Sequence, residues 1–116
     1  MKTISLAFAA CLTAVSVHAG PFDGVYHPAG ETWDCRSDQI GGDGGAVAIL
    51  GEWLEGVESR CQLTQPTPVR DMKAVLYDAV CSELGETTTH RLMILSHDRG
   101  VYLIRDGYVS DWRFCP

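Results

Sequence analysis

The four cysteines that follow an apolar N-terminal segment constrain the fold of this 116-residue chain more than any other feature. They stand at Cys35, Cys61, Cys81 and Cys115, while a fifth, Cys11, lies inside the apolar segment. An even number of cysteines downstream of an export signal is typical of disulfides formed in an oxidising compartment. Isolated cysteines without a C-x-x-C pair lack the spacing of zinc sites. We therefore expect two structural disulfides, with no metal and no cofactor.

The pairing of these cysteines is open, because four cysteines allow three connectivities. Their order along the chain favours Cys35–Cys61 together with Cys81–Cys115. A simple meander of the expected strands places Cys81 at the opposite end of the sheet from the other three, whereas bridged Cα atoms must lie within about 7 Å. Either the sheet is coiled or the pairing differs.

Residues 1–19 have the pattern of a secretory signal peptide. Lys2 supplies a positive start, residues 3–17 carry no charge, and Val17-His18-Ala19 offers small or β-branched residues to a signal peptidase. The apolar run is shorter than the roughly 20 residues of a membrane span, so we expect cleavage after Ala19 and no transmembrane segment in the mature chain. The expected location is the periplasm or the exterior. Lipidation at Cys11 is disfavoured because the apolar run continues past it.

The charge of the chain is acidic, with a net value of −6, and Lys2 is the only charged residue among the first 19. An acidic surface argues against nucleic acid and against anionic membranes, and it permits a basic protein partner. Residues 20–116 are long enough for one small domain. Its core is expected to be thin, so cross-links contribute much of its stability.

Short β-favouring segments separated by Gly and Pro predict a mainly β domain of about seven antiparallel strands, closed or nearly closed like a barrel. The expected strands are residues 22–27, 46–50, 53–63, 73–83, 90–96, 101–105 and 108–115, and 32–35 is a further short segment. Gln65-Pro66-Thr67-Pro68 is expected to break the sheet, because proline cannot donate to a ladder. Asp106-Gly107 predicts a hairpin. Its expected pairs are Arg105 with Tyr108, Leu103 with Ser110, and Val101 with Trp112.

Residues 68–84 admit two structures. Their apolar residues recur at helical spacing, and Pro68 and Gly85 stand where a helix would begin and end. The β-formers Val75, Tyr77 and Val80 and the β-type flanks favour a strand instead. We favour the strand and keep an α+β fold with a helix here as the alternative.

The remaining candidates for chemistry lack the spacing that their reactions require. The histidines of the mature chain are His27, His90 and His97. Only His97 has a neighbouring carboxylate, Asp98, and adjacent turn residues point apart; no serine lies in a G-x-S-x-G elbow. Three aspartates near the glycine-rich loop 41–45 lack the alternation of a calcium loop. They are Asp34, Asp38 and Asp43. We therefore expect no catalytic and no metal-binding residues.

One acidic surface is a candidate for contact with a partner. Glu52, Glu55 and Glu58 lie beside Trp53, and an aromatic side chain with an acidic rim suits a basic protein. The simpler interpretation is a solvated strand edge, where charge also prevents aggregation.

Three stretches resemble small exported proteobacterial β domains that are largely uncharacterised. In those domains a cysteine ends one strand, a Glu/Gly-rich turn follows, and the next strand opens near an arginine. Cys81-Ser82-Glu83-Leu84-Gly85-Glu86-Thr87, followed by Arg91-Leu92, has this pattern, and Phe22-Asp23-Gly24-Val25-Tyr26 and Trp112-Arg113-Phe114-Cys115 are similar in style. The resemblance implies a disulfide-bonded β architecture and export, but no mechanism.

Size, export, disulfides and acidity together resemble the small lysozyme-inhibitor barrels. The expected function is accordingly a non-catalytic exported binding or envelope-protective domain, most concretely an inhibitor of a cationic hydrolase such as lysozyme. The Ser-Gly-rich inhibitory loop of those families has no counterpart here, since residues 41–45 are only glycine-rich. The alternative is a small exported hydrolase that uses a histidine and carboxylates. A carrier of a small ligand would need an interior cavity of at least about 300 Å³, which a chain of this length is not expected to enclose.

Overall fold

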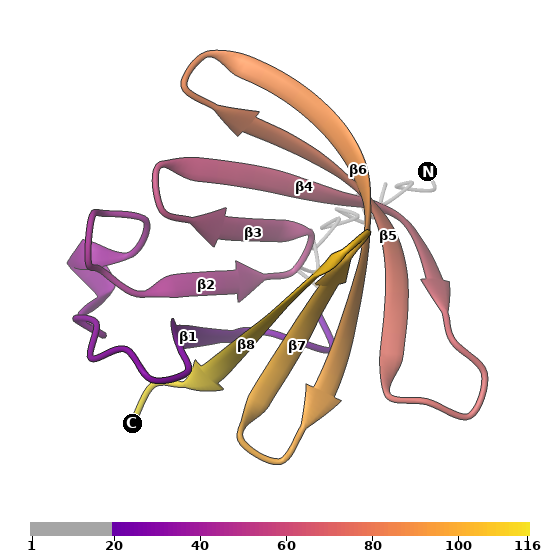
Figure 1. The fold of residues 1–116 in the computed structure, drawn as a ribbon, viewed down its shortest axis with the longest axis horizontal. Coiled ribbons are helices and arrows are strands. Elements are labelled where there is room, and N and C mark those ends of the chain that lie inside the picture. Colours follow the sequence, from indigo (N-terminus) through magenta and orange to yellow (C-terminus); the bar gives the residue numbers. More distant parts are fainter. Residues whose placement is uncertain (1–19) are drawn as a thin grey trace, which may run out of the picture.

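The computed structural model describes residues 20–116 as a closed antiparallel barrel of eight strands (Figure 1). The strands follow one another around the barrel in chain order, and the last pairs with the first. They are β1 (Gly24–Pro28), β2 (Val47–Leu50), β3 (Trp53–Gly56), β4 (Ser59–Pro68), β5 (Ala74–Glu83), β6 (Glu86–His97), β7 (Gly100–Arg105) and β8 (Tyr108–Phe114). The mainly β prediction is confirmed, with one strand more than expected.

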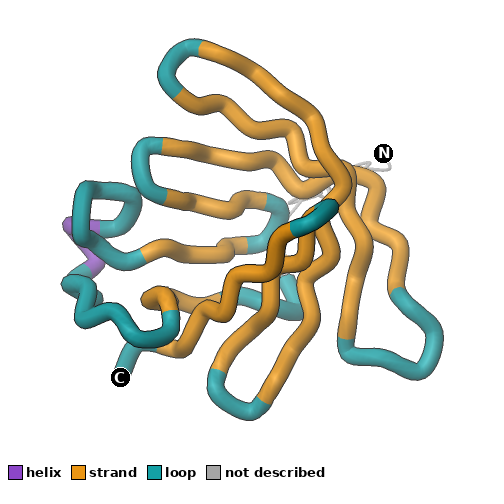
Figure 2. The backbone as a smooth tube through the Cα atoms, in the orientation of Figure 1, coloured by secondary structure: helices purple, strands orange, loops and turns teal. Residues whose placement is uncertain are grey.

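Helix is almost absent from the described residues. The tube in Figure 2 has a single short helical turn, the 3₁₀ helix η1 (Ser37–Gln39), in the loop between β1 and β2. None of the helical structure in residues 20–116 is long and apolar enough to cross a bilayer. The predicted signal peptide and Cys11 lie outside the described residues.

The ambiguous segment is a strand, so the α+β alternative is wrong. β5 pairs with β6 in an unbroken register from Ala74 opposite Leu95 to Glu83 opposite Glu86. The two-residue turn between them holds Leu84 at a φ of 49° and Gly85 at 81°. Positive φ at both turn positions matches the right-handed twist of the flanking strands, which stabilises a tight hairpin. In Figure 1 this long hairpin projects at the upper left.

Two expected boundaries were wrong. Residues 53–63 are two strands rather than one, because Val57-Glu58 forms a tight turn that pairs Gly56 with Ser59. The proline-rich stretch does not break the sheet; β4 continues through it with a register shift between Thr64 and Thr67. A bulge leaves a residue unpaired and so tolerates the missing N–H of proline. Residues 32–35 contribute only an isolated bridge from Asp34 to Gly45.

The two disulfides are Cys35–Cys115 and Cys61–Cys81, so the pairing favoured from the sequence is wrong. The unexpected turn at Val57-Glu58 reverses the chain before Cys61. As a result, Cys61 lies directly opposite Cys81 across β4 and β5. Cys35–Cys115, with 5.9 Å between the Cα atoms, ties the β1–β2 loop to the residue that follows β8.

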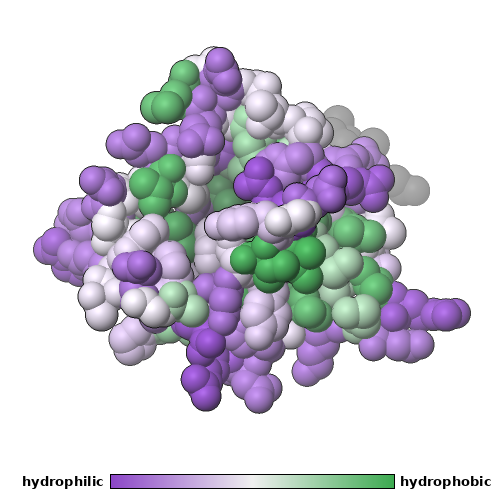
Figure 3. All heavy atoms as spheres, in the orientation of Figure 1, coloured by the Kyte–Doolittle hydropathy of each residue, from purple (hydrophilic) through white to green (hydrophobic). Residues whose placement is uncertain are grey.

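Apolar and polar residues alternate along the strands, and the apolar side chains on the inner face fill part of the barrel interior. The most completely buried large side chains are Tyr26, Ile49, Ile94 and Val101. Phe22 lies before β1 and joins this core. On the face seen in Figure 3, apolar surface areas are separated by hydrophilic ones.

Candidate functional site

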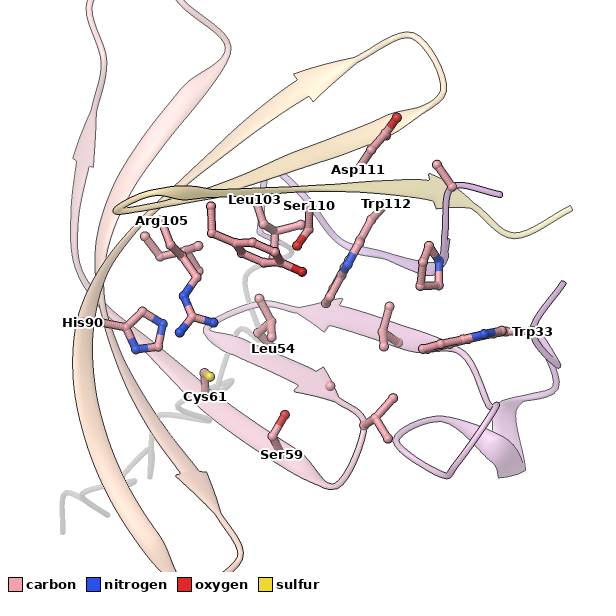
Figure 4. Close-up of a pocket in the computed structure, with 17 residues that line it drawn as sticks. Trp33, Leu54, Ser59, Cys61, His90, Leu103, Arg105, Ser110, Asp111 and Trp112 are labelled. Carbon is pink, nitrogen blue, oxygen red and sulfur yellow. The ribbon is translucent and has the colours of Figure 1, made fainter. Parts of the chain in front are cut away.

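The barrel interior is not completely filled. A cavity of about 450 Å³ remains between the β1–β2 loop, the β3–β4 hairpin and the inner faces of β6, β7 and β8 (Figure 4). Its apolar wall consists of buried core residues, among them Leu54, Leu92 and Leu103. The cavity reaches the surface, because Tyr108 lines it and is 60% exposed. It can therefore exchange its contents with solvent.

Polar residues of β6, β7 and β8 line this cavity because strand geometry turns them inward. Alternate residues of a strand lie on the same face. Arg105 follows Val101 and Leu103 on the same face of β7; these two are buried, whereas Arg105 is exposed at the end of the strand and lies at the rim of the cavity. His90 alternates in the same way with the buried Leu92 on β6. In Figure 4 the Arg105 guanidinium and the His90 ring lie on the same side of the cavity.

The β7–β8 hairpin determines which residues form the adjoining part of the cavity wall. Its register is the predicted one, with Arg105 opposite Tyr108 and Leu103 opposite Ser110. Ser110 is therefore an inward position occupied by a small side chain. Ser59 holds a similar position at the start of β4, and both serines line the cavity. Small residues at inward positions leave the volume that larger side chains fill elsewhere in the barrel.

Two tryptophans flank the cavity. Trp112 of β8 is held against the buried Tyr26, with 6.2 Å between the ring centroids. Trp33 comes from the β1–β2 loop and lies across the cavity from His90 (Figure 4). Two residues after Trp33, the Cys35–Cys115 disulfide anchors that loop. Both indole rings are thus attached to fixed parts of the fold.

In the described part of the chain, the side chains that line the cavity include one positive charge, on Arg105, that no carboxylate neutralises. Within residues 20–116, no carboxylate lies within 4.0 Å of the Arg105 guanidinium, since none of the ion pairs includes it. The one acid among the described lining residues is Asp111. Its carboxylate accepts hydrogen bonds from Arg113 at 2.8 Å and is 2.8 Å from His97 Nε2. The hydrogen bonds from Arg113, and then those from His97, hold the pKa of Asp111 below its usual value.

His90 is the titratable neighbour of Arg105. Burial of the ring, and secondly the positive charge of Arg105, lower its pKa below the ordinary value of 6.5. The imidazole is therefore neutral at neutral pH, with one N–H donor and one acceptor. Its Nε2 lies 3.9 Å from Sγ of Cys81, a sulfur that is oxidised in the disulfide and has no proton to exchange.

The acidic surface predicted around Trp53 has a different character. Arg60 lies directly opposite Glu55 in the β3–β4 hairpin. Its Nε donates to Glu55 Oε1 at 2.6 Å, and its guanidinium carbon is 3.8 Å from the centroid of the Trp53 ring. The structure therefore covers Trp53 with a cation and pairs one of its three acids. Like Trp53, the acids Glu52, Glu55 and Glu58 are not part of the cavity lining.

Sequence reasoning missed Arg105 as a site residue and considered His90 only for catalysis. A signal was present in the strand pattern. With the Asp106-Gly107 hairpin predicted, alternation along residues 101–105 places a charged side chain on the same face as Val101 and Leu103. Arg105 stands at the exposed end of this face, where a long charged side chain can reach both solvent and the rim of the interior. No protein family model matches the chain, and the searches of curated proteins and of solved structures find no significant match.

Proposed function

We propose that this protein is an exported, non-catalytic binding domain that holds a small molecule inside one part of its barrel. The observation that carries the proposal is the cavity of about 450 Å³, which falls within the usual range for small-ligand sites. Barrels of eight strands have an interior wide enough to hold one small ligand. This cavity is open to solvent, and serines occupy inward positions beside it that a compact core would give to larger residues.

Export is supported by two observations. Residues 1–19 have the pattern of a signal peptide. Two disulfides join the cysteines of the described chain, and such bonds persist in oxidising compartments. The periplasm or the exterior is the proposed location.

The hydrolase alternative has weaker support. The histidine with a carboxylate partner is His97, and its partner Asp111 is already held by Arg113. His90 faces the cavity, but the described structure gives it no hydrogen bond to a serine, threonine or thiol that could act as a nucleophile. Inhibition of a cationic hydrolase such as lysozyme is supported by the size, the signal-peptide pattern, the disulfides and the acidic net charge, but by no inhibitory loop. A lysozyme assay with micromolar protein tests it, and absence of inhibition would remove it.

Two matched dyes test the binding proposal. N-phenyl-1-naphthylamine is neutral, and 8-anilinonaphthalene-1-sulfonate has the same aromatic body with one sulfonate. At least one of them should bind the disulfide-bonded mature domain with a stoichiometry of one and gain fluorescence. The variant Ser110→Phe places a large ring at an inward position and should abolish this binding.

The matched control is Val109→Phe, one residue away on the outer face, where Val109 is 58% exposed. It should leave the binding unchanged. Absence of binding of both dyes to the unmodified domain would overturn the proposal. Equal loss in the two variants would do so too, because the dye would then bind outside the cavity.

A further inference from the structure

We infer that the cavity selects an organic anion, a molecule with a flat apolar body and one carboxylate- or sulfonate-type head that contacts Arg105. This inference rests on the small-molecule binding proposed above and names the chemical class of the ligand. It is carried by the position of a guanidinium without a carboxylate partner among the described residues, at the polar side of a cavity that has both polar and apolar walls.

The first step concerns the charge that the ligand must bring. A guanidinium presents its donors in a planar fork that matches the two oxygens of a carboxylate. Arg105 is exposed to solvent at the rim, its guanidinium extends over the cavity in Figure 4, and no ion pair within residues 20–116 includes it. Asp111 has its oxygens occupied by Arg113 and His97. A cationic ligand would therefore meet a positive charge and find no available carboxylate in the described lining.

The second step concerns the hydrogen-bonding groups around that charge. Neutral His90 can donate one N–H to an anionic oxygen beside Arg105. Ser59 and Ser110 add hydroxyl groups to the lining, and Tyr108 adds a phenol. The charged and titratable groups that line the cavity with His90 are thus Arg105, Tyr108 and the paired Asp111. A bound anion adds negative charge near His90, so the pKa of His90 should rise when the ligand binds.

The third step concerns the body of the ligand. Beyond the polar residues the lining includes Leu54, Leu92 and Leu103, with Trp112 and Trp33 as aromatic walls. In Figure 4 Trp33 lies at the far side of the cavity from His90 and Arg105. A ligand with its head at Arg105 would therefore extend an apolar or aromatic body toward the tryptophans. Apolar surface leaving water supplies affinity there, and the single charged contact orients the molecule.

The dye pair separates this inference from the binding function itself. The sulfonate dye should bind the unmodified domain several-fold more tightly than its neutral counterpart, as expected for one hydrogen-bonded charge pair at a solvated rim. Arg105→Gln should weaken the sulfonate dye several-fold and the neutral dye much less. Arg105→Lys keeps the charge without the fork and should give an intermediate loss.

A matched control is Arg91→Gln. Arg91 follows His90 on β6, its side chain is 72% exposed, and it forms an ion pair with Asp78. It should leave the affinity for both dyes unchanged. Equal affinity of the two dyes would overturn the anion class and leave the binding function standing. Equal weakening of both dyes by Arg105→Gln would also overturn it. An independent readout is the His90 titration followed by NMR: the sulfonate dye should raise its pKa, and an unchanged pKa on saturation would contradict contact between the anion and this pair.

Discussion

Removal of the two disulfides should destabilise the domain unequally, in an order set by the loops they close. Cys35–Cys115 joins residues 80 apart in the sequence, and Cys61–Cys81 joins residues 20 apart. In the chain-entropy model, loops of these lengths correspond to about 4.5 and about 3.3 kcal/mol. A small domain typically has a stability of about 5–15 kcal/mol, so either loss is a large part of the total.

The two variants need different substitutions, because the two disulfides differ in burial. Cys61 and Cys81 are each 7% exposed and belong to the core, so Cys61→Val with Cys81→Val keeps apolar volume at both positions. Cys35 and Cys115 are only partly buried, and alanine suffices there. Urea unfolding followed by tryptophan fluorescence gives the free energy of unfolding of each variant. The urea dependence should steepen in both, since an unlinked denatured chain exposes more surface, so free energies extrapolated to water are compared rather than midpoints.

The expected result is that loss of Cys35–Cys115 costs about 1 kcal/mol more than loss of Cys61–Cys81. The reverse order would refute the reasoning. It would mean that the hairpin cross-link acts through the folded state, by holding β4 and β5 together, rather than through the entropy of the unfolded chain. If Cys35→Ala with Cys115→Ala is too unstable to fold, a folded Cys61→Val with Cys81→Val variant would still agree with the predicted order.

Three further predictions follow from the cavity wall and from one close backbone contact. Replacing Arg105 with Gln should raise the pKa of His90, but not fully to 6.5, because burial of the ring is the larger cause of the lowered pKa. NMR titration measures the pKa of His90, and an unchanged value would contradict the proximity of the two side chains. The pKa of His90 is lower in the folded state than in the unfolded chain, so the unfolded chain binds a proton first as the pH falls. The contribution of neutral His90 to the free energy of unfolding is therefore complete above pH 6.5. It is lost as the pH falls through 6.5 toward the folded-state pKa. Urea unfolding on both sides of pH 6.5 should show this dependence weakened in His90→Gln, and an identical dependence would refute it. Gly100→Ala should prevent stable folding, since its Cβ would lie 1.9 Å from the Trp112 carbonyl oxygen, whereas Gly44→Ala should cost only about 1–2 kcal/mol for its positive φ; circular dichroism and thermal unfolding compare the two.

The features that the sequence predicted are those that depend on local pattern. The Asp106-Gly107 turn and the alternation around it determined the pairing of β7 with β8, including Leu103 opposite Ser110. The strand at β5 followed from β-branched and aromatic residues, although its apolar spacing also suits a helix. In each case the information lies within a few residues of the feature.

Sequence reasoning missed one local turn and several features that depend on contacts between distant segments. One overlooked turn at Val57-Glu58 changed the direction of β4 and with it the partner of Cys61. The cavity was missed because its volume is a property of the closed barrel: it arises only when Ser59 of β4 and Ser110 of β8 face the same interior. The inward direction of Arg105 was accessible from the sequence, but its lack of an acidic partner was not, since Glu55 and Asp111 find partners through the fold.

Filling the cavity should stabilise the protein and abolish ligand binding in the same variant. Ser110 faces Leu103 across the hairpin and borders the cavity, so the side chain of Ser110→Leu has apolar surroundings and available volume. Burying a leucine side chain is worth about 1.5–3 kcal/mol, and part of this is offset by the lost solvation of the hydroxyl, so a net gain of about 1 kcal/mol is expected. The control Val109→Leu changes an exposed outer position and should leave both stability and dye binding near those of the unmodified domain. Small and polar residues at core-facing positions lower the stability of the protein without its ligand. At a binding site, replacing such a residue with a larger apolar one is therefore expected to raise stability while it removes binding. If Ser110→Leu instead destabilises the domain, the volume beside Ser110 is not available to a side chain, and its assignment as a ligand site loses its physical basis.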